Sequence, residues 1–192
     1  MGSPVLFPFQ RLCIRKEPVV GGSKRSSVLL SSAVSCKPST WSKLRRVLCR
    51  VLKDHEVLGT LSLALVSDEE IRNVHRDFLG VDTPTDVISF PLKSSEGFEH
   101  DDVLGQVVVS VDTARREARL RRLPLDREVA LYAIHGTLHL VGYDDLESAK
   151  KRVMRRAERH YLCIYDELKS QSRSSRRPEA PRPRKKQRPA RA

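Results

Sequence analysis

The chain has 192 residues, enough for one domain with additional segments, and a formal net charge of +12. The basic excess favours an acidic partner such as nucleic acid, and no apolar run is long enough to cross a membrane. The four cysteines form no CxxC pair and are typical of free thiols in a reducing compartment, which argues against a disulfide-rich secreted protein.

The positive charge lies mostly at the two ends of the chain. Residues 1–40 carry a net charge of +5 and residues 170–192 one of +8, whereas residues 41–169 carry −1. We predict a basic, mostly unstructured N-terminal extension over 1–40, a folded domain over 41–169 and a disordered basic tail over 170–192. The extension has the composition of an organellar transit peptide or of an extended start. We therefore expect a cytoplasmic protein or, alternatively, an organellar one.

The first half of the chain contains short segments with clear periodicity. In chain order we predict a strand at Val28–Leu30, a helix over 41–54, a buried strand LSLALV, a helix over 68–78 and a strand over 86–90. Ser67 and Glu70 have the spacing of a capping box, which begins the second helix. Gly80 ends that helix.

The second half is mostly helical. We predict a mobile loop over 92–102, a strand over 104–111, a helix over 113–123, a helix over about 126–141 and a last helix over about 146–168. Asp112 is expected to cap the helix over 113–123, and Gly142 is expected to end the helix over about 126–141. The order of elements indicates an α+β or α/β sandwich. We expect α+β, with a small mixed sheet packed with helices.

The stretch HGTLHLVGYDD, residues 135–145, carries the strongest chemical signal. His135 and His139 lie one helical turn apart and face the same side, which is the spacing that two imidazoles need to bind one cation. Gly136 lets another backbone or a ligand come close, although glycine costs about 1 kcal/mol in helix propensity. Gly142 lets the chain fold back, so that Asp144 or Asp145 comes near the histidines.

A metal site is one of two interpretations of this stretch. Three protein ligands with an open fourth position are typical of catalytic Zn²⁺, and two histidines with one carboxylate also suit Fe²⁺. Alternatively, the two histidines belong to a buried helix and bond to backbone or water. A metallopeptidase is disfavoured, because Gly136 stands where the HExxH motif has its general base.

HGTLHLVGYDD resembles the HGxLHLxGYDH signature of the YbeY family of metal-dependent endoribonucleases. VHRDFLGVDTPTDVISFP and LGQVVVSVDTARREA are similar to further segments of that family, and the resemblance covers about residues 41–168. It implies an α+β fold, a zinc ion held by three histidines and cleavage of single-stranded RNA. It also implies a role in 16S rRNA 3′-end maturation and ribosome quality control, with the small ribosomal subunit as partner.

The chain departs from the family pattern at the third ligand. Asp145 stands where the family has its third histidine, so we expect His135, His139 and Asp145 to hold the metal and to act through its bound water, with Asp144 as the other candidate. An anionic ligand makes that water less acidic, and we expect a pH–rate profile shifted to higher pH than in a three-histidine relative. Leu79 replaces a common arginine, and Gln106 a common acid.

Arginines are the candidate RNA-binding residues, because a phosphodiester backbone needs cationic donors. We predict phosphate contacts from Arg115, Arg116 and Arg119 on the helix over 113–123, and from Arg76 near the turn at 82–86. The alternative for the arginine helix is a solvated face. The alternative for the whole protein is a non-catalytic ribosome- or RNA-binding protein with a structural or vestigial metal site.

Overall fold

The computed structural model describes residues 26–34, 38–91 and 103–174, with side chains described as far as residue 168. The predicted loop over 92–102 and most of the two predicted basic ends lie outside these residues. The predicted first strand is β1 (Ser27–Ser32). Both it and the start of α1 (Pro38–Asp54) lie within 1–40, and α5 (Ser148–Ser174) continues past residue 169.

The remaining elements follow the predicted order. They are β2 (Thr60–Val66), α2 (Asp68–Leu79), β3 (Val87–Pro91), β4 (Val103–Ser110), α3 (Val111–Arg121) and α4 (Leu125–Leu140). The sheet has the order β1-β2-β4-β3, in which β1, β2 and β4 run parallel and β3 pairs antiparallel with β4. The fold is therefore α+β with a small mixed sheet, as predicted.

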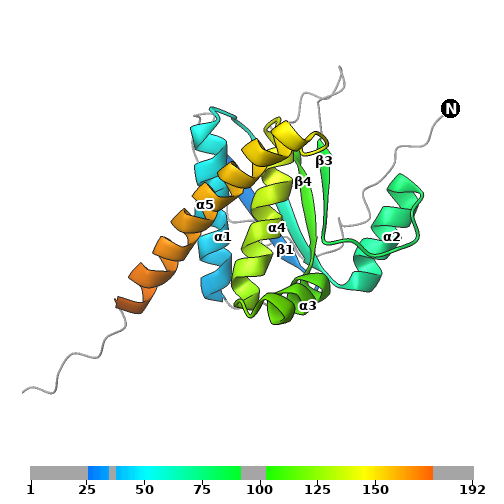
Figure 1. Cartoon of the computed structure of the whole chain (residues 1–192), viewed down its shortest axis with the longest axis horizontal. Helices are drawn as coiled ribbons and strands as arrows, with labels where there is room; N and C mark the ends of the chain where they lie inside the picture. The colour runs from blue at the N-terminus through cyan, green and yellow to red at the C-terminus, as the bar shows by residue number, and fades with distance from the viewer. Residues whose placement is uncertain (1–25, 35–37, 92–102, 175–192) are drawn as a thin grey trace, which may run out of the picture.

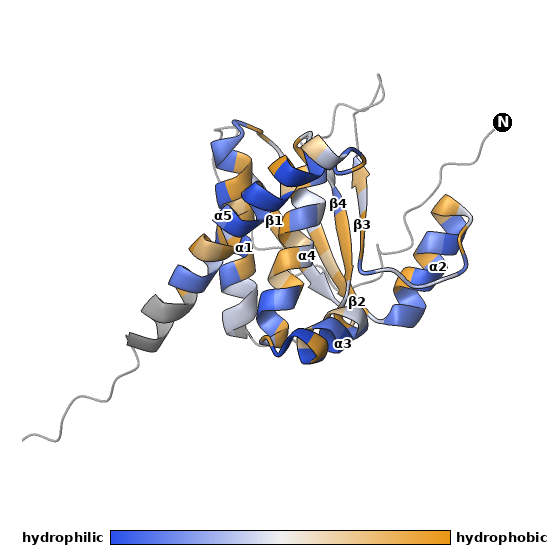
Figure 2. Cartoon of the chain, in the orientation of Figure 1, coloured by the Kyte–Doolittle hydropathy of each residue, from blue (hydrophilic) through white to orange (hydrophobic). Residues whose placement is uncertain are grey.

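Alternating side chains of the central strands supply two hydrophobic cores. Leu61, Leu63 and Leu65 of β2 enter a large core together with α1, α4 and α5. Ala64 and Val66 point to the other face, where they form a smaller core with Ile71 and Val74 of α2. Figure 1 shows this arrangement, with α1, α4 and α5 on one side and α2 set apart from them (Figure 1). In Figure 2 the strands between these layers are largely hydrophobic (Figure 2).

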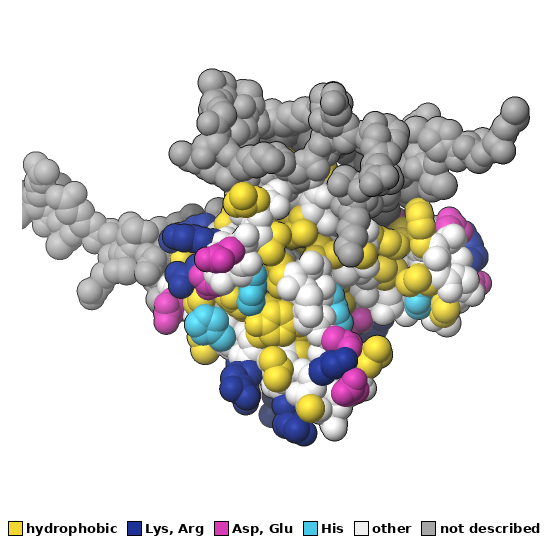
Figure 3. All heavy atoms as spheres, turned by 90° about the horizontal axis from the view of Figure 1, so that it is seen from above, with side chains coloured by type: hydrophobic (Ala, Val, Ile, Leu, Met, Phe, Trp, Pro, Cys, Tyr) yellow, Lys and Arg dark blue, Asp and Glu magenta, His cyan; other side chains and the backbone are white. Residues whose placement is uncertain are grey.

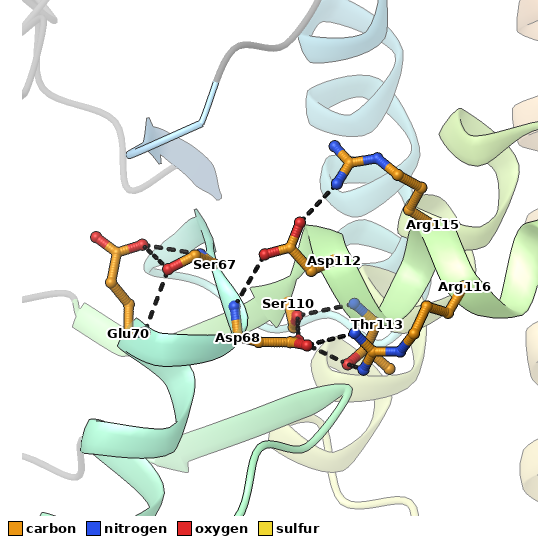
Figure 4. A network of polar contacts seen from close by, with 8 residues as sticks. All are labelled: Ser67, Asp68, Glu70, Ser110, Asp112, Thr113, Arg115 and Arg116. Atoms are coloured by element: carbon orange, nitrogen blue, oxygen red, sulfur yellow. Dashed lines mark hydrogen bonds and ion pairs between the residues drawn. The ribbon is translucent and has the colours of Figure 1, made fainter.

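Helices α2 and α3 are joined at their first turns by a network of polar contacts (Figure 4). Asp68 Oδ1 accepts hydrogen bonds from the hydroxyls of Ser110 and Thr113, and Oδ2 pairs with Arg116. Ser110, rather than Asp112, caps α3, and its side chain accepts from the Thr113 amide. The prediction for Asp112 was wrong because Asp112 already lies in the first turn, where it accepts from the Asp68 amide instead.

The predicted capping box of α2 is confirmed. The Ser67 hydroxyl accepts from the Glu70 amide, and the Glu70 carboxylate accepts from the Ser67 amide at 2.8 Å. Gly80 ends the helix with φ 71°, a left-handed conformation that suits glycine. These local signals fix the place of α2 in the sequence, and with it one wall of the cleft described below.

Candidate metal centre

The two histidines lie on the last turns of α4 at the end of the molecule that is uppermost in Figure 1. Their Nε2 atoms lie 3.1 Å apart, and His139 Nε2 lies 3.7 Å from Asp145 Oδ1. In the described part of the chain, this is the single group of three His, Cys, Asp or Glu residues whose ligand atoms all lie within 4.8 Å of one another. The structure thus brings together the three residues that we predicted to hold a metal.

The second nitrogen of each imidazole has its own acceptor. His135 Nδ1 lies 2.7 Å from Glu158 Oε1 on α5, and His139 Nδ1 lies 3.1 Å from the Tyr143 carbonyl oxygen. Each Nδ1 therefore carries the proton of the neutral ring and donates it, so both Nε2 lone pairs face one another. Two lone pairs at this distance repel unless a proton or a cation lies between them.

The donor set fits a divalent cation. Two imidazole nitrogens bound to one tetrahedral Zn²⁺ lie about 3.3 Å apart, since each Zn–N bond is about 2.0–2.1 Å. The observed 3.1 Å between the Nε2 atoms is close to that separation. His135, His139 and Asp145 are half-buried, with side chains 23%, 32% and 34% exposed, so a ligand can reach the site from solvent.

Glu158 also raises the affinity of His135 for a proton. Burial alone would lower the pKa of His135, but the hydrogen bond and the negative charge of Glu158 outweigh it and raise the pKa above its ordinary value. Sequence reasoning missed Glu158, which lies 23 residues beyond His135 on another helix. Its one signal is a carboxylate on the predicted last helix, and that is too common to indicate a role.

Asp144 has other partners. Its Oδ1 accepts from the Leu146 amide at 3.1 Å, and its Oδ2 pairs with Lys150 Nζ, also at 3.1 Å. The backbone hydrogen bond from Leu146, followed by the contact with Lys150, lowers the pKa of Asp144. The Asp144 carboxylate thus stabilises the turn that leads to α5, while the Asp145 carboxylate lies beside the histidines.

The structure explains why residue 136 is a glycine. A Cβ at this position would lie 2.7 Å from Val107 Cγ1 and 2.8 Å from Ser89 Oγ, distances at which the neighbours must move. The Ser89 hydroxyl also donates to the Gly136 carbonyl at 3.0 Å. The close approach that glycine permits is therefore between α4 and the strands β3 and β4.

A cleft of about 450 Å³ opens beside the histidines. Its walls are α4, the segment 85–91 and α2, and its lining includes His135, His139, Asp86, His75 and Leu79. Sequence reasoning missed His75, whose Nδ1 lies 2.7 Å from the Thr83 carbonyl. Within the described part of the chain its Nε2 has no partner, so this nitrogen remains for a ligand in the cleft.

The predicted RNA-binding arginines do not lie at this cleft. Arg115, Arg116 and Arg119 are on α3, at the opposite end of α4 from the histidines (Figure 1). Arg115 pairs with Asp112, and Arg116 pairs with Asp68. Arg76 is on α2 next to His75, but it is exposed and lies 3.1 Å from Asp77 and 3.9 Å from Asp82.

The fold and the cluster define an α+β protein with a candidate metal site, and the comparisons place it in a family. The model of the family Endoribonuclease YbeY matches residues 31–166. The chain therefore belongs to the YbeY family. None of the helices in the described part of the chain has the length and apolar character of a membrane span.

Individual relatives agree with this assignment. An Endoribonuclease YbeY of Desulfitobacterium hafniense (strain Y51) is 44% identical over 104 residues, which cover 51% of this chain and 66% of that protein. One of Syntrophotalea carbinolica is 42% identical over 121 residues, 60% of this chain and 81% of that protein. The solution structure of TM1509 from Thermotoga maritima superposes with a TM-score of 0.55 at 25% identity, covering 84% of this chain and 99% of that one.

Proposed function

We propose that the chain is a metal-dependent endoribonuclease that cleaves single-stranded RNA. The observation that carries the proposal is the pair of Nε2 atoms 3.1 Å apart, with the Asp145 carboxylate beside them, in a member of the YbeY family. The cleft of about 450 Å³ lies within the size range of small-ligand pockets, about 300–1,000 Å³.

The protein side chains hold and orient the ion in this proposal. His135 and His139 bind it through Nε2, and Asp145 supplies the third ligand. Glu158 and the Tyr143 carbonyl keep both Nδ1 protons in place, as partners of metal-bound histidines do. A bound Zn²⁺, or another divalent ion such as Fe²⁺, would lower the pKa of a coordinated water and polarise a phosphoryl oxygen.

The resemblance to the family supports a proposal for the biological role. We propose that the substrate is 16S rRNA at its 3′ end, that the partner is the small ribosomal subunit, and that the protein contributes to ribosome quality control. The compartment that suits this role is the cytoplasm or, if residues 1–40 are a transit peptide, an organelle. Leu79, 56% exposed in the cleft wall, supplies no cation there and favours the alternative of a non-catalytic RNA-binding protein.

A cleavage assay on a labelled single-stranded oligoribonucleotide tests the activity. We expect cleavage by the purified full chain, loss of cleavage with a chelator and loss in His139→Ala. Cleavage that survives both changes would come from a contaminating nuclease and would contradict the proposal. Intact RNA binding with no cleavage by the metal-loaded chain would establish the non-catalytic alternative.

Metal analysis of two aspartate variants tests the third ligand. We expect Asp145→Ala to lower the bound metal per chain. Asp144→Ala is the matched control and should keep it, because its carboxylate bonds to the Leu146 amide and Lys150. Equal metal content in Asp145→Ala and the unmodified chain would exclude Asp145 as a ligand.

A further inference from the structure

The N-terminal half of α5 carries a dense group of exposed cations, which we call the α5 track. Its members are Lys151, Arg152, Arg155, Arg156 and Arg159. Within the described part of the chain, none of these side chains forms an ion pair with an acid. Figure 3 views the molecule from above, and Lys and Arg side chains lie along the border of the face that it shows, which also carries His side chains (Figure 3).

The α5 track is electrostatically unfavourable for the helix that carries it. Lys151 and Arg155 are four residues apart, as are Arg155 and Arg159, and like charges at this spacing repel on a helix surface. The first turn of α5 has no acidic residue, although the positive end of the helix dipole favours one there. An anion bound along the track would relieve both effects.

The α5 track leads to the candidate metal centre. Glu158, which accepts from His135, lies on the same helix among the track residues. Lys151 and Arg155 precede it by seven and three residues and so lie on its side of the helix, about 10 Å and about 5 Å away along the axis. Anionic groups bound to these side chains would lie next to the metal centre.

The arginines of α3 are placed differently. Three of the four arginines of this helix, Arg115, Arg116 and Arg121, pair with at least one carboxylate each. Arg121 contacts Glu128 near the start of α4, and His139 lies eleven residues further along that helix, about 16 Å away. Their charge is largely neutralised, and it is far from the candidate ligands.

We propose that the α5 track binds the phosphate backbone of single-stranded RNA and positions the strand at the metal centre. The proposal rests on the proposed function, in which RNA is the anion that binds at this end of the molecule. A polyanionic strand matches the track in charge, and a row of cations on one helix face can contact successive phosphates.

The experiment measures RNA binding at several salt concentrations. It uses the metal-loaded full chain and a fluorescent single-stranded RNA with a phosphorothioate backbone. The test variant is K151Q/R155Q/R159Q. The matched comparison is R115Q/R116Q/R119Q on α3, which removes the same charge. Each lost phosphate contact on a single strand lowers the salt slope of log K by about 0.7, so we expect the α5 variant to lose about 2 from the slope. We expect the α3 variant to keep the original slope.

Thermal melting separates a binding defect from a folding defect. Removing the like-charge pairs should leave the melting temperature of the α5 variant equal or higher, so weak binding by this variant is a loss of contacts. An unchanged slope in the α5 variant would overturn the proposal, as would equal losses in both variants or a loss in the α3 variant alone. Absence of RNA cleavage by the unmodified chain would instead count against the proposed function, whatever the slopes show.

Discussion

At the scale of single residues, Glu158 is the side chain that orients His135 in the centre. It fixes the Nδ1 proton of His135, and no other described side chain contacts that nitrogen. We expect Glu158→Gln to weaken Zn²⁺ binding by about 10–100-fold, the usual effect of changing a partner of a metal-bound histidine. Competition with a chromophoric chelator measures this affinity.

Glu147→Gln is the control for this change. Glu147 is 67% exposed and pairs only with Lys150 among the described residues, so its variant should bind metal with the original affinity. Equal affinities in the Glu158 and Glu147 variants would mean that the contact with His135 contributes nothing to metal binding.

Gly136 is the second residue with a strong individual effect. Alanine gains about 1 kcal/mol in helix propensity over glycine, but here its Cβ would meet Val107 and Ser89 at under 3 Å. Overpacking of this kind destabilises by about 1–3 kcal/mol. We therefore expect Gly136→Ala to lower the free energy of unfolding measured with urea. Asn73→Ala, on an exposed position of α2, should leave it equal or raise it, and a gain in both variants would refute the packing argument.

At the scale of elements, the contact between α2 and α3 depends on the charge of Asp68. Burial opposes ionisation of this carboxyl, but hydrogen bonds from Arg116, Ser110 and Thr113 outweigh it and lower its pKa. A carboxyl with a lowered pKa in the folded state stabilises the fold above its unfolded pKa of about 3.9. That stabilisation is lost as the pH falls through the folded pKa.

Asp68→Asn tests this linkage. We expect the variant to lose about 1.5–3 kcal/mol of unfolding free energy at neutral pH, the range for a hydrogen bond to a charged group. The difference from the unmodified chain should shrink as the pH falls below about 4. Asp77→Asn, whose carboxylate is 58% exposed, should show little change at any pH. A pH-independent loss in Asp68→Asn would show that the charge of Asp68 is not what joins the two helices.

At the scale of the whole molecule, the sequence predicted local features well and spatial neighbours poorly. The capping box at Ser67, the helix that bears His135 and His139 and the turn that returns Asp145 all depend on residues close in sequence. Glu158 reaches the centre, and His75 the cleft, only through the packing of α5 and α2, which no periodicity reveals. The arginines of α3 formed a conspicuous run, but their partners and their distance from the histidines depend on the tertiary structure.

Two of the three walls of the cleft, α4 and α2, belong to different hydrophobic cores. The α4 wall is anchored in the large core by several buried side chains, including Ile134 and Leu138, and is covered by α5. The α2 wall is held by two buried side chains, Ile71 and Val74. Elements with few buried apolar contacts open locally at lower free energy than the core does.

Local opening at α2 therefore changes the width of the cleft while the spacing of the candidate ligands stays fixed. Native-state hydrogen exchange should show faster exchange for amides of α2 than for those of α4, with bound RNA slowing α2 more. Equal protection of the two helices would mean that the cleft opens and closes as one unit. Faster exchange in α2 than in α4 would mean that the metal centre stays rigid while the α2 wall moves. RNA strands of different size could then enter the cleft without disturbing the ligands.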